Sequence, residues 1–230
     1  IAPGDTVLLR THGVSLEEEA YFRERGIACR DLTCSRVKAV QRLIGKKRRE
    51  GCRILIVGDP LHPKVKAHLS YAGASAAVLR KKEDAESIRV EGKAVLLAQT
   101  STSAELFADL AEVLKRRYPE LQVLNTLCPS VLSRQRWIDR HARLAGASLI
   151  IGGKNSSNVR KLYEIAALHG PAYWVAAPGE LEVKSLLAFP VVACTAGAST
   201  PETTIEAILS RLQSACLLYT SPSPRDRTRS

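Results

Sequence analysis

Short apolar runs alternate with helical patterns along most of the chain. Between the runs, apolar residues recur with the 3.6-residue period of a helix, as at Val37, Val40 and Ile44. Strands that are apolar on both faces and alternate with helices are typical of parallel sheets covered on each side. The pattern therefore predicts an α/β fold class. The apolar runs predict strands at 6–10, 53–59, 76–79, 93–99, 121–125, 148–153, 172–176 and 191–196.

Several motifs recur along the chain at a fixed spacing. Cys34 and Cys128 lie 94 residues apart (128 − 34), and so do the glycines that open two loops, Gly58 and Gly152 (152 − 58). A third kind of loop follows a strand three times, at 11–17, 99–105 and 195–202. This period predicts one α/β unit repeated around a shared centre. We expect a remnant of a first unit at 1–34, a second unit at 35–127 and a third at 128–215, with the front half of the first unit missing.

The two ends of the chain do not fit this repeat. The sequence opens with IAPGDTVLLR, which has neither a methionine nor a secretion signal, so we expect a chain that is truncated at its start. From Cys216 onward, CLLYTSPSPRDRTRS loses all periodicity and closely resembles the translation of a sequencing-library adapter. We interpret 216–230 as a non-native, disordered tail; a native basic tail is the alternative.

Composition narrows the class of partner. The formal net charge is +11, and aromatic residues make up only 5% of the chain, which leaves few side chains for stacking on bases. The densest basic run, 46–49, ends a predicted helix, where cations stabilise the carbonyl end of the helix dipole. We expect no nucleic-acid partner and, because no run of about 18 apolar residues occurs, no membrane span. A modest positive field favours an anionic small molecule.

The cysteines do not form the pattern of a disulfide framework. We expect Cys29, Cys52 and Cys194, which fall in or beside apolar strands, to be buried free thiols. Cys34 and Cys128 instead lie between a strand and a helix start, a setting that lowers the pKa of a thiol and suits metal ligation. Two thiolates alone would form a disulfide or a poor metal site. A third from the missing half-unit would allow an iron–sulfur cubane with one iron open to substrate.

Polar loops at the carboxyl ends of the predicted strands carry the remaining candidate chemistry. The loop GGKNSSN, which starts at Gly152, supplies N–H groups and hydroxyls at a helix start, as an anion site requires; a simple polar N-cap is the alternative. His12 and His62 lie in two equivalent loops, and convergence on one ligand, a metal or a phosphate, explains both. No zinc-type spacing is present. We expect three further histidines to lie on the surface: His68, His141 and His169.

The ordered set of motifs resembles the 4-hydroxy-3-methylbut-2-enyl diphosphate reductase family, also called IspH/LytB, from about Thr6 to Gln213. The motifs are RTHGVS, T-C-x-x-V, H-P-x-V, Q-T-S, T-L-C, G-x-K-N-S-S-N and T-A-G-A-S-x-P-E. The resemblance implies a pseudo-threefold trefoil of α/β units around a 4Fe–4S cluster. It also implies a cytoplasmic bacterial enzyme of the non-mevalonate isoprenoid pathway, with ferredoxin or flavodoxin as electron donor. Such an enzyme removes the hydroxyl of an allylic diphosphate to yield isopentenyl and dimethylallyl diphosphates.

The resemblance assigns roles to the residues that match the family motifs. Cys34 and Cys128 match two of the three cluster ligands, and the third cysteine has no counterpart in this chain. Thr100 matches the threonine near the substrate hydroxyl. The remaining matches imply binding of the diphosphate by His12, His62, Ser156, Ser157, Asn158 and Ser199.

One departure from the family affects the chemistry. Where the family motif H-P-E-V has a glutamate that supplies a proton, this chain has Lys64. A carboxylic acid beside a diphosphate keeps its proton and can deliver it, whereas the same anionic surroundings raise the pKa of a lysine. We expect Lys64 to bind diphosphate but to be a poor acid, so that loss of the hydroxyl is strongly impaired.

Three functions remain open from the sequence. The first is a divergent reductase of this family, inactive as this fragment because a cluster ligand is missing. The second is a non-catalytic relative that binds a diphosphate or a cluster. The third is a two-unit α/β module that binds a sugar phosphate or a nucleotide without a metal, and it alone requires no third cysteine.

Overall fold

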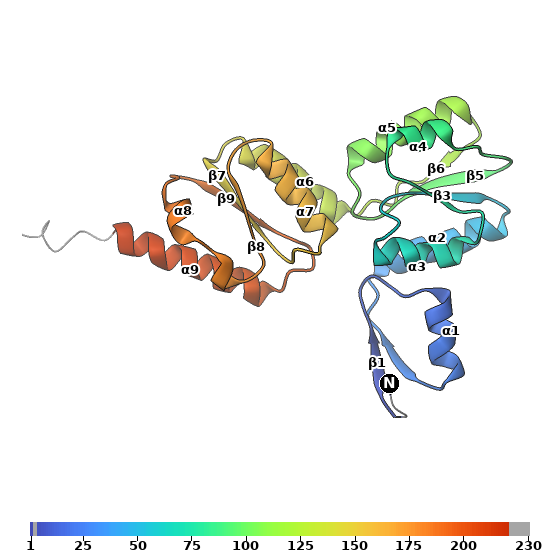
Figure 1. The fold of residues 1–230 in the computed structure, drawn as a ribbon, viewed down its shortest axis with the longest axis horizontal. Coiled ribbons are helices and arrows are strands. Elements are labelled where there is room, and N and C mark those ends of the chain that lie inside the picture. Colours follow the sequence, from blue (N-terminus) through green and yellow to red (C-terminus); the bar gives the residue numbers. More distant parts are fainter. Residues whose placement is uncertain (2–3, 221–230) are drawn as a thin grey trace, which may run out of the picture. The chain divides into compact units, whose positions relative to one another are not determined.

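The computed structural model describes residue 1 and residues 4–220, with side chains up to residue 215. It divides into two compact bodies, which we call the N-body, Ile1–Cys128, and the C-body, Pro129–Ser230. In each body strands alternate with helices, and every strand pair of the described residues is parallel (Figure 1). The expected α/β fold class is therefore confirmed.

The N-body holds two parallel sheets. Its first two strands pair with each other, and the other four form a sheet in the order β4-β3-β5-β6. The first predicted repeat unit thus contributes a smaller sheet than the second. The elements are β1 (Thr6–Leu9), α1 (Leu16–Glu24), β2 (Ala28–Asp31), α2 (Ser35–Arg49), β3 (Arg53–Val57), α3 (Pro63–Ala72), β4 (Ala77–Leu79), α4 (Lys82–Ser87), β5 (Ala94–Ala98), α5 (Ala104–Arg117) and β6 (Gln122–Val123).

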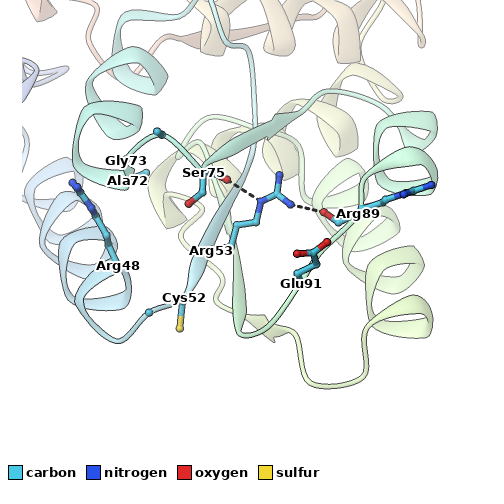
Figure 2. A pocket seen from close by; sticks show the side chains of 10 residues that line it. Arg48, Cys52, Arg53, Ala72, Gly73, Ser75, Arg89 and Glu91 are labelled. Carbon is cyan, nitrogen blue, oxygen red and sulfur yellow. Dashed lines mark hydrogen bonds between the residues drawn. The ribbon is translucent and has the colours of Figure 1, made fainter.

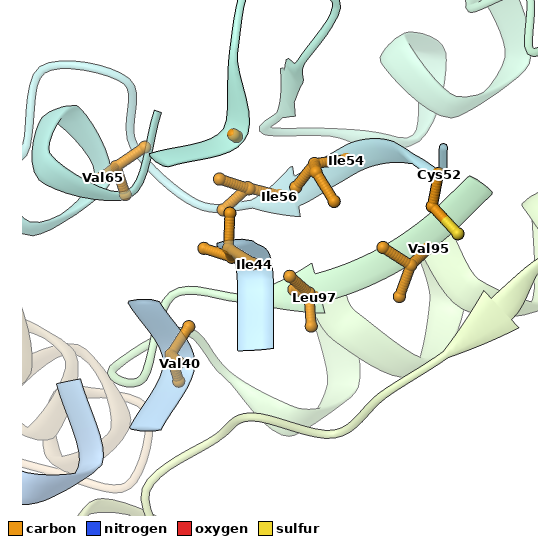
Figure 3. Packing of buried hydrophobic residues seen from close by; sticks show 9 residues of the cluster. Val40, Ile44, Cys52, Ile54, Ile56, Val65, Val95 and Leu97 are labelled. Carbon is orange, nitrogen blue, oxygen red and sulfur yellow. The ribbon is translucent and has the colours of Figure 1, made fainter. Parts of the chain in front are cut away.

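A buried core joins α2 and α3 to the central strands β3 and β5 (Figure 3). In register, Ile54 pairs with Val95 and Ile56 pairs with Leu97, and all four side chains are buried. The alternate residues of β3, such as Leu55, are buried as well. Because neighbouring side chains on a strand face opposite sides, β3 is covered on both faces, as its uninterrupted apolar run predicts.

Helix starts in the N-body follow from the local sequence. The Oγ of Ser15 accepts from the N–H of Glu18 at 3.1 Å, while the Glu18 carboxylate accepts from the N–H of Ser15 at 2.7 Å, which is a capping box at α1. Ser103 caps α5 by accepting from the N–H of Leu106 at 3.2 Å. Pro63 begins α3, where its missing N–H leaves no hydrogen bond unmade. These caps lie just after strands, at the carboxyl edge of a sheet.

The C-body has a single three-stranded parallel sheet in its described part, in the order β8-β7-β9. Its central strand β7 is completely buried. The elements are α6 (Pro129–Ala142), β7 (Ala147–Ile151), α7 (Ser157–Ala167), β8 (Ala172–Val175), a short 3₁₀ turn (Pro178–Glu180), α8 (Val183–Leu187), β9 (Val192–Ala196) and α9 (Glu202–Thr220).

The structure contains all eight predicted strands and adds β2, which the sequence pattern misses. The sequence of β2, ACRD, has no apolar run, and all of its residues are exposed. Cys29 lies on this strand, so the expectation of a buried thiol there is wrong; Cys52 is buried and Cys194 is partly buried, as expected. His68 is also a correction, because its side chain is fully buried against the expectation of a surface residue.

The predicted division into repeat units at 1–34, 35–127 and 128–215 stays a prediction. The boundary between the two compact bodies falls after Cys128, next to the predicted start of the third unit. Helix α9 continues to Thr220, beyond the predicted start of the tail at Cys216, and residues 221–230 lie outside the described part. No helix of the described residues is both long and apolar enough to cross a membrane.

Candidate functional site

The predicted site residues of the N-body all lie in loops or helix starts that follow strands. In open α/β sheets this carboxyl edge is where ligands bind. The positions are His12 after β1, Cys34 after β2, His62 and Lys64 after β3, Thr100 after β5 and Cys128 after β6.

Backbone hydrogen bonds tie the two candidate cysteines to neighbouring loops. The N–H of Cys34 donates to the carbonyl of Thr11 at 3.1 Å, and the N–H of Cys128 donates to the carbonyl of Thr100 at 2.9 Å. Cys34 is the N-cap residue of α2 and is exposed, whereas Cys128 is partly buried. The two thiols are thus held on loops next to the other candidate side chains.

His12 and His62 come together although they belong to different sheets. Their ring centroids lie 5.4 Å apart, with the rings at 70° to each other. The Nδ1 of His62 accepts from the N–H of Lys64 at 3.1 Å, which places the proton of the neutral ring on Nε2. Burial, followed by the charge of Lys64, lowers the pKa of His62 to about 4 and also lowers that of His12. His62 is therefore neutral near pH 7 and offers Nε2–H as a donor.

Lys64 lies in the first turn of α3 and reaches the loop after β5. Its Nζ donates to Oγ1 of the buried Thr100 at 2.8 Å. Burial lowers the pKa of Lys64, and the nearby Cys34 and Cys128, when ionised, act in the opposite direction. The pKa of Lys64 is therefore lowered in this structure, whereas we expect it to be raised when a diphosphate is bound. The anion would supply the negative charge that opposes the effect of burial.

Gln99 is a candidate site residue that the sequence reasoning did not select. Its buried side chain accepts from the N–H of Asp59 at 2.9 Å and donates to Oγ of Ser101 at 3.1 Å. It thereby fixes the loop after β3 against the loop after β5. The available signal was its place at the start of the Q-T-S motif, directly after a buried strand.

The predicted site residues of the C-body lie after β7 and β9. Ser156 caps α7 by accepting from the N–H of Val159 at 3.4 Å, and Ser157 is the first residue of that helix. Asn158 is buried, and its Oδ1 and Nδ2 have no hydrogen-bond partner among the described residues. Ser199 is exposed in the loop after β9.

Two glycines let these C-body loops pack together. A Cβ on Gly197 would lie 2.4 Å from Cγ2 of Val159, and a Cβ on Gly152 would lie 2.7 Å from Oγ1 of Thr200. The N–H of Gly197 donates to the carbonyl of Ile151 at 2.9 Å. The start of α7 and the loop before α9 are therefore neighbours.

The structure thus brings the predicted site residues together in two sets, one in each body. The N-body set is joined by the His12–His62 contact and by the reach of Lys64 to Thr100. The C-body set is joined by the packing of its two loops. The convergence of both sets on one ligand, and the role of each residue, stay predictions.

A pocket in the N-body lies at the other end of the strands and contains none of the predicted site residues. It has a volume of about 860 Å³ and is lined by residues at or before the starts of β3, β4 and β5 (Figure 2). There Arg53 donates from Nε to the carbonyl of Ser75 at 2.8 Å and from Nη1 to the carbonyl of Arg89. Arg53 therefore joins the start of β3 to two loops. We assign it a structural role, because the candidate chemistry lies at the carboxyl edge.

Known proteins resemble this chain over nearly its whole length. The family model described as "LytB protein" matches residues 2–213. The 4-hydroxy-3-methylbut-2-enyl diphosphate reductase of Campylobacter fetus subsp. fetus (strain 82-40) is 33% identical over 207 residues, which cover 90% of this chain and 74% of the relative. The reductase of the same name from Aquifex aeolicus (strain VF5) is 34% identical over 217 residues, covering 93% of this chain and 75% of the relative.

Solved structures also match the fold of this chain. A structure of (E)-4-hydroxy-3-methyl-but-2-enyl diphosphate reductase aligns with a TM-score of 0.65 at 32% identity, covering 93% of this chain and 78% of that one. The corresponding reductase from Plasmodium falciparum aligns with a TM-score of 0.83 at 21% identity, covering 94% of this chain and 68% of that one, and this likeness concerns the fold alone. With a family model and relatives that span nearly the whole chain, this chain belongs to the LytB protein family.

Proposed function

We propose that this chain is a 4-hydroxy-3-methylbut-2-enyl diphosphate reductase with impaired turnover. The reaction of the family takes two electrons and protons, replaces the allylic hydroxyl by hydrogen and releases water; we propose ferredoxin or flavodoxin as the electron donor. The observation that carries the proposal is the N-body set itself. In this set His12 contacts His62, and Lys64, which lies near Cys34 and Cys128, donates to the buried Thr100. Relatives of this chain bear the name of the reductase.

The residues of this chain are suited to hold a diphosphate. His62 is neutral and presents Nε2–H as a donor, as its bond from Lys64 requires. In the C-body, Asn158 keeps both amide atoms unpartnered within the described residues, beside the start of a helix whose N–H groups favour anions. We propose that His12, His62, Ser156, Ser157, Asn158 and Ser199 bind the diphosphate and that Thr100 lies near the substrate hydroxyl.

The cysteines of this chain meet only part of what a 4Fe–4S cluster requires. Cys34 and Cys128 both lie near Lys64, and two thiolates are fewer than a cluster normally takes. In the part of the chain that the structure describes, no three residues of His, Cys, Asp or Glu are arranged to hold a metal ion. The residues present therefore do not fit a complete cluster site. We propose Cys34 and Cys128 as two of its ligands and derive no reaction step from them.

A second function, a relative that binds diphosphate without turnover, is favoured by one contact. The Nζ of Lys64 donates to Oγ1 of Thr100, the residue proposed to lie near the substrate hydroxyl. A bound diphosphate would raise the pKa of this ammonium, which would then hold its proton more tightly. Positioned proton donors contribute roughly 100-fold to 10,000-fold to a reaction rate, so an ammonium that fails to deliver its proton leaves binding intact and slows turnover.

Replacing Lys64 by an acid separates the two functions. In a chain completed with the third cluster cysteine and reconstituted anaerobically with iron and sulfide, we expect Lys64→Glu to raise turnover with a reduced dye by about 100-fold or more. Lys66→Glu is the matched control, since it makes the same charge change at an exposed position of the same helix and should leave turnover unchanged.

Iron content and the affinity for inorganic diphosphate, measured by calorimetry, complete the test. An unchanged rate in an iron-loaded Lys64→Glu variant would contradict the role given to Lys64. If neither variant holds iron, the reductase function fails for this chain. Diphosphate binding to the original chain then supports the second function, and its absence rejects both.

A further inference from the structure

Gln41 is a buried side chain whose amide nitrogen lies unused beside a candidate site loop. It lies on α2, about two helical turns after Cys34, and is 6% exposed. Its Nε2 has no hydrogen-bond partner among the described residues. A Cβ built on Gly13 would lie 2.7 Å from this nitrogen, and Gly13 has φ of +76°. The absence of a side chain at Gly13 therefore lets the Gln41 amide reach the loop that carries His12.

His12 has the complementary unused atom. Its Nδ1 is buried and, within the described residues, also lacks a hydrogen-bond partner. A neutral imidazole has one nitrogen that donates and one that accepts, and burial, followed by the charges of Lys64 and Arg10, lowers the pKa of His12 and keeps it neutral. A buried polar atom without a partner is costly. The donor on Gln41 and the acceptor on His12 would satisfy each other.

The neighbouring His62 shows what such a bond does. Its Nδ1 accepts from the backbone N–H of Lys64 at 3.1 Å, so its proton is on Nε2. His12 is not a helix cap but lies in a turn closed by the N–H of Gly13 donating to the carbonyl of Arg10 at 3.0 Å. It therefore needs another donor to fix its tautomer, and Gln41 lies against the next residue of the same turn.

We propose that Gln41 is a positioning residue for His12: its amide donates to Nδ1, directly or through one water, so that His12 presents Nε2–H to the same anion as His62. A bridging water is nearly as favourable as a direct bond. The proposal deepens the proposed function, because it states how one of the diphosphate-binding histidines is prepared for its ligand.

Histidine side-chain ¹⁵N NMR of the ligand-free chain tests this at constant pH, with the His12 signal identified by its loss in His12→Phe. We expect a single tautomer with the proton on Nε2 in the original chain. Gln41→Leu should yield a mixture of tautomers, and Gln41→Glu, which offers only acceptors, should move the proton to Nδ1. Gln135→Leu is the matched control: Gln135 is also buried, has an unpartnered Nε2 and lies 94 residues further along (135 − 41), in the C-body.

A purely structural role for Gln41 would change thermal stability and leave the tautomer as it was. A wild-type His12 protonated on Nδ1, or one unaffected by Gln41→Leu and Gln41→Glu, would overturn the proposal. The affinity for inorganic diphosphate should fall about fivefold in Gln41→Leu, the effect of one hydrogen bond. If diphosphate binds neither protein, the proposed function fails, while the tautomer result still decides the role of Gln41.

Discussion

Helices α3 and α7 begin at equivalent points of the predicted repeat, yet their first turns carry different chemistry. His62 caps α3, and Ser156, 94 residues further along (156 − 62), caps α7. Two residues later α3 has Lys64 and α7 has Asn158, again 94 residues apart (158 − 64). The same local structure, a strand end followed by a capped helix, therefore carries a cation in the N-body and a neutral amide in the C-body.

The two side chains are satisfied in different ways. Lys64 donates to Thr100 within the N-body. Asn158 is buried, and neither of its amide atoms has a partner in the described residues. An unsatisfied buried polar group costs about 1–3 kcal/mol, a cost expected mainly at functional sites. The amide atoms of Asn158 in the C-body are therefore available to the anion that we propose, whereas Lys64 in the N-body already donates to Thr100.

We expect the largest difference between the two helix starts at Gly152 and Gly58, the glycines that open the loops before α7 and α3. Alanine at the two positions should lower the free energy of unfolding by different amounts. At Gly152, φ is +147° and an added Cβ would lie 2.7 Å from both Thr200 and Val159; at Gly58 it would lie 2.6 Å from Gln99. We expect Gly152→Ala to lower the free energy of unfolding by about 3 kcal/mol and Gly58→Ala by about 2 kcal/mol, because only the first adds backbone strain to overpacking.

Denaturant titration can follow each change in its own body. Both tryptophans of the chain, Trp137 and Trp174, lie in the C-body, so fluorescence reports on Gly152→Ala, and circular dichroism reports on both bodies. Gly153→Ala is the control, since a Cβ there meets nothing within 4 Å and should be nearly neutral. An equal loss at Gly153 would reject the packing explanation.

Acid should destabilise the N-body through His68. Burial, followed by the charges of Lys64 and His62, lowers the pKa of His68 from 6.5 to about 4. The unfolded chain therefore binds more protons between these values, and stability is complete above pH 6.5 and falls as the pH decreases toward 4. His68→Leu should remove about 2–3 kcal/mol of this pH dependence, measured by circular dichroism in denaturant at several pH values.

A matched change in the other body controls for loss of a histidine. His141 lies in the C-body, where its Nδ1 contacts the carbonyl of Trp137 at 2.8 Å. We expect His141→Leu to retain the acid sensitivity of the original chain. Part of the acid sensitivity should survive in His68→Leu, because the pKa values of His62 and His12 are lowered as well. A His68→Leu variant with the full pH dependence of the original chain would show that His68 does not contribute to it.

The smallest expected effect concerns the unpartnered amide of the C-body. Asn158→Leu should weaken the binding of inorganic diphosphate about tenfold, equivalent to about 1.4 kcal/mol, and should raise the free energy of unfolding by about 1 kcal/mol, because two unsatisfied atoms are removed. Calorimetry and denaturant titration measure the two effects. Asn155→Leu, an exposed asparagine of the same loop, should change neither. Unchanged affinity in Asn158→Leu would remove Asn158 from the anion site.

The sequence predicts the apolar strands of the fold better than it predicts exposed strands and the burial of polar side chains. The runs that become β3, β5 and β7 are uninterrupted and apolar, and buried parallel strands require that pattern. The exposed strand β2 escapes prediction because it pairs through its backbone and buries no side chain. His68 shows the converse error, since a polar residue on a helix is expected at the surface and packing alone places it inside.

Some residues of the candidate site can likewise be predicted from the sequence, and others cannot. The motifs locate His12, His62, Thr100 and the two cysteines at strand ends, and parallel pairing brings the ends within each sheet to one edge. The contact between His12 and His62 joins the two sheets. The motif comparison also singles out Lys64 as a departure. Gln99 starts the Q-T-S motif directly after a buried strand, which is a signal of its place. Gln41 carries no such signal in a single sequence, because a glutamine on a helix is usually exposed.

The sequence by itself determined the α/β class, the positions of the apolar strands, several helix starts and the loops that carry the candidate chemistry. These features depend on the period of apolar residues and on caps and glycines, which act over a few neighbouring residues. Only the tertiary structure decided that Lys64 donates to Thr100, that His12 meets His62 and that Gln41 lies against Gly13. Each of these contacts joins segments far apart in the chain, so it depends on how the elements pack.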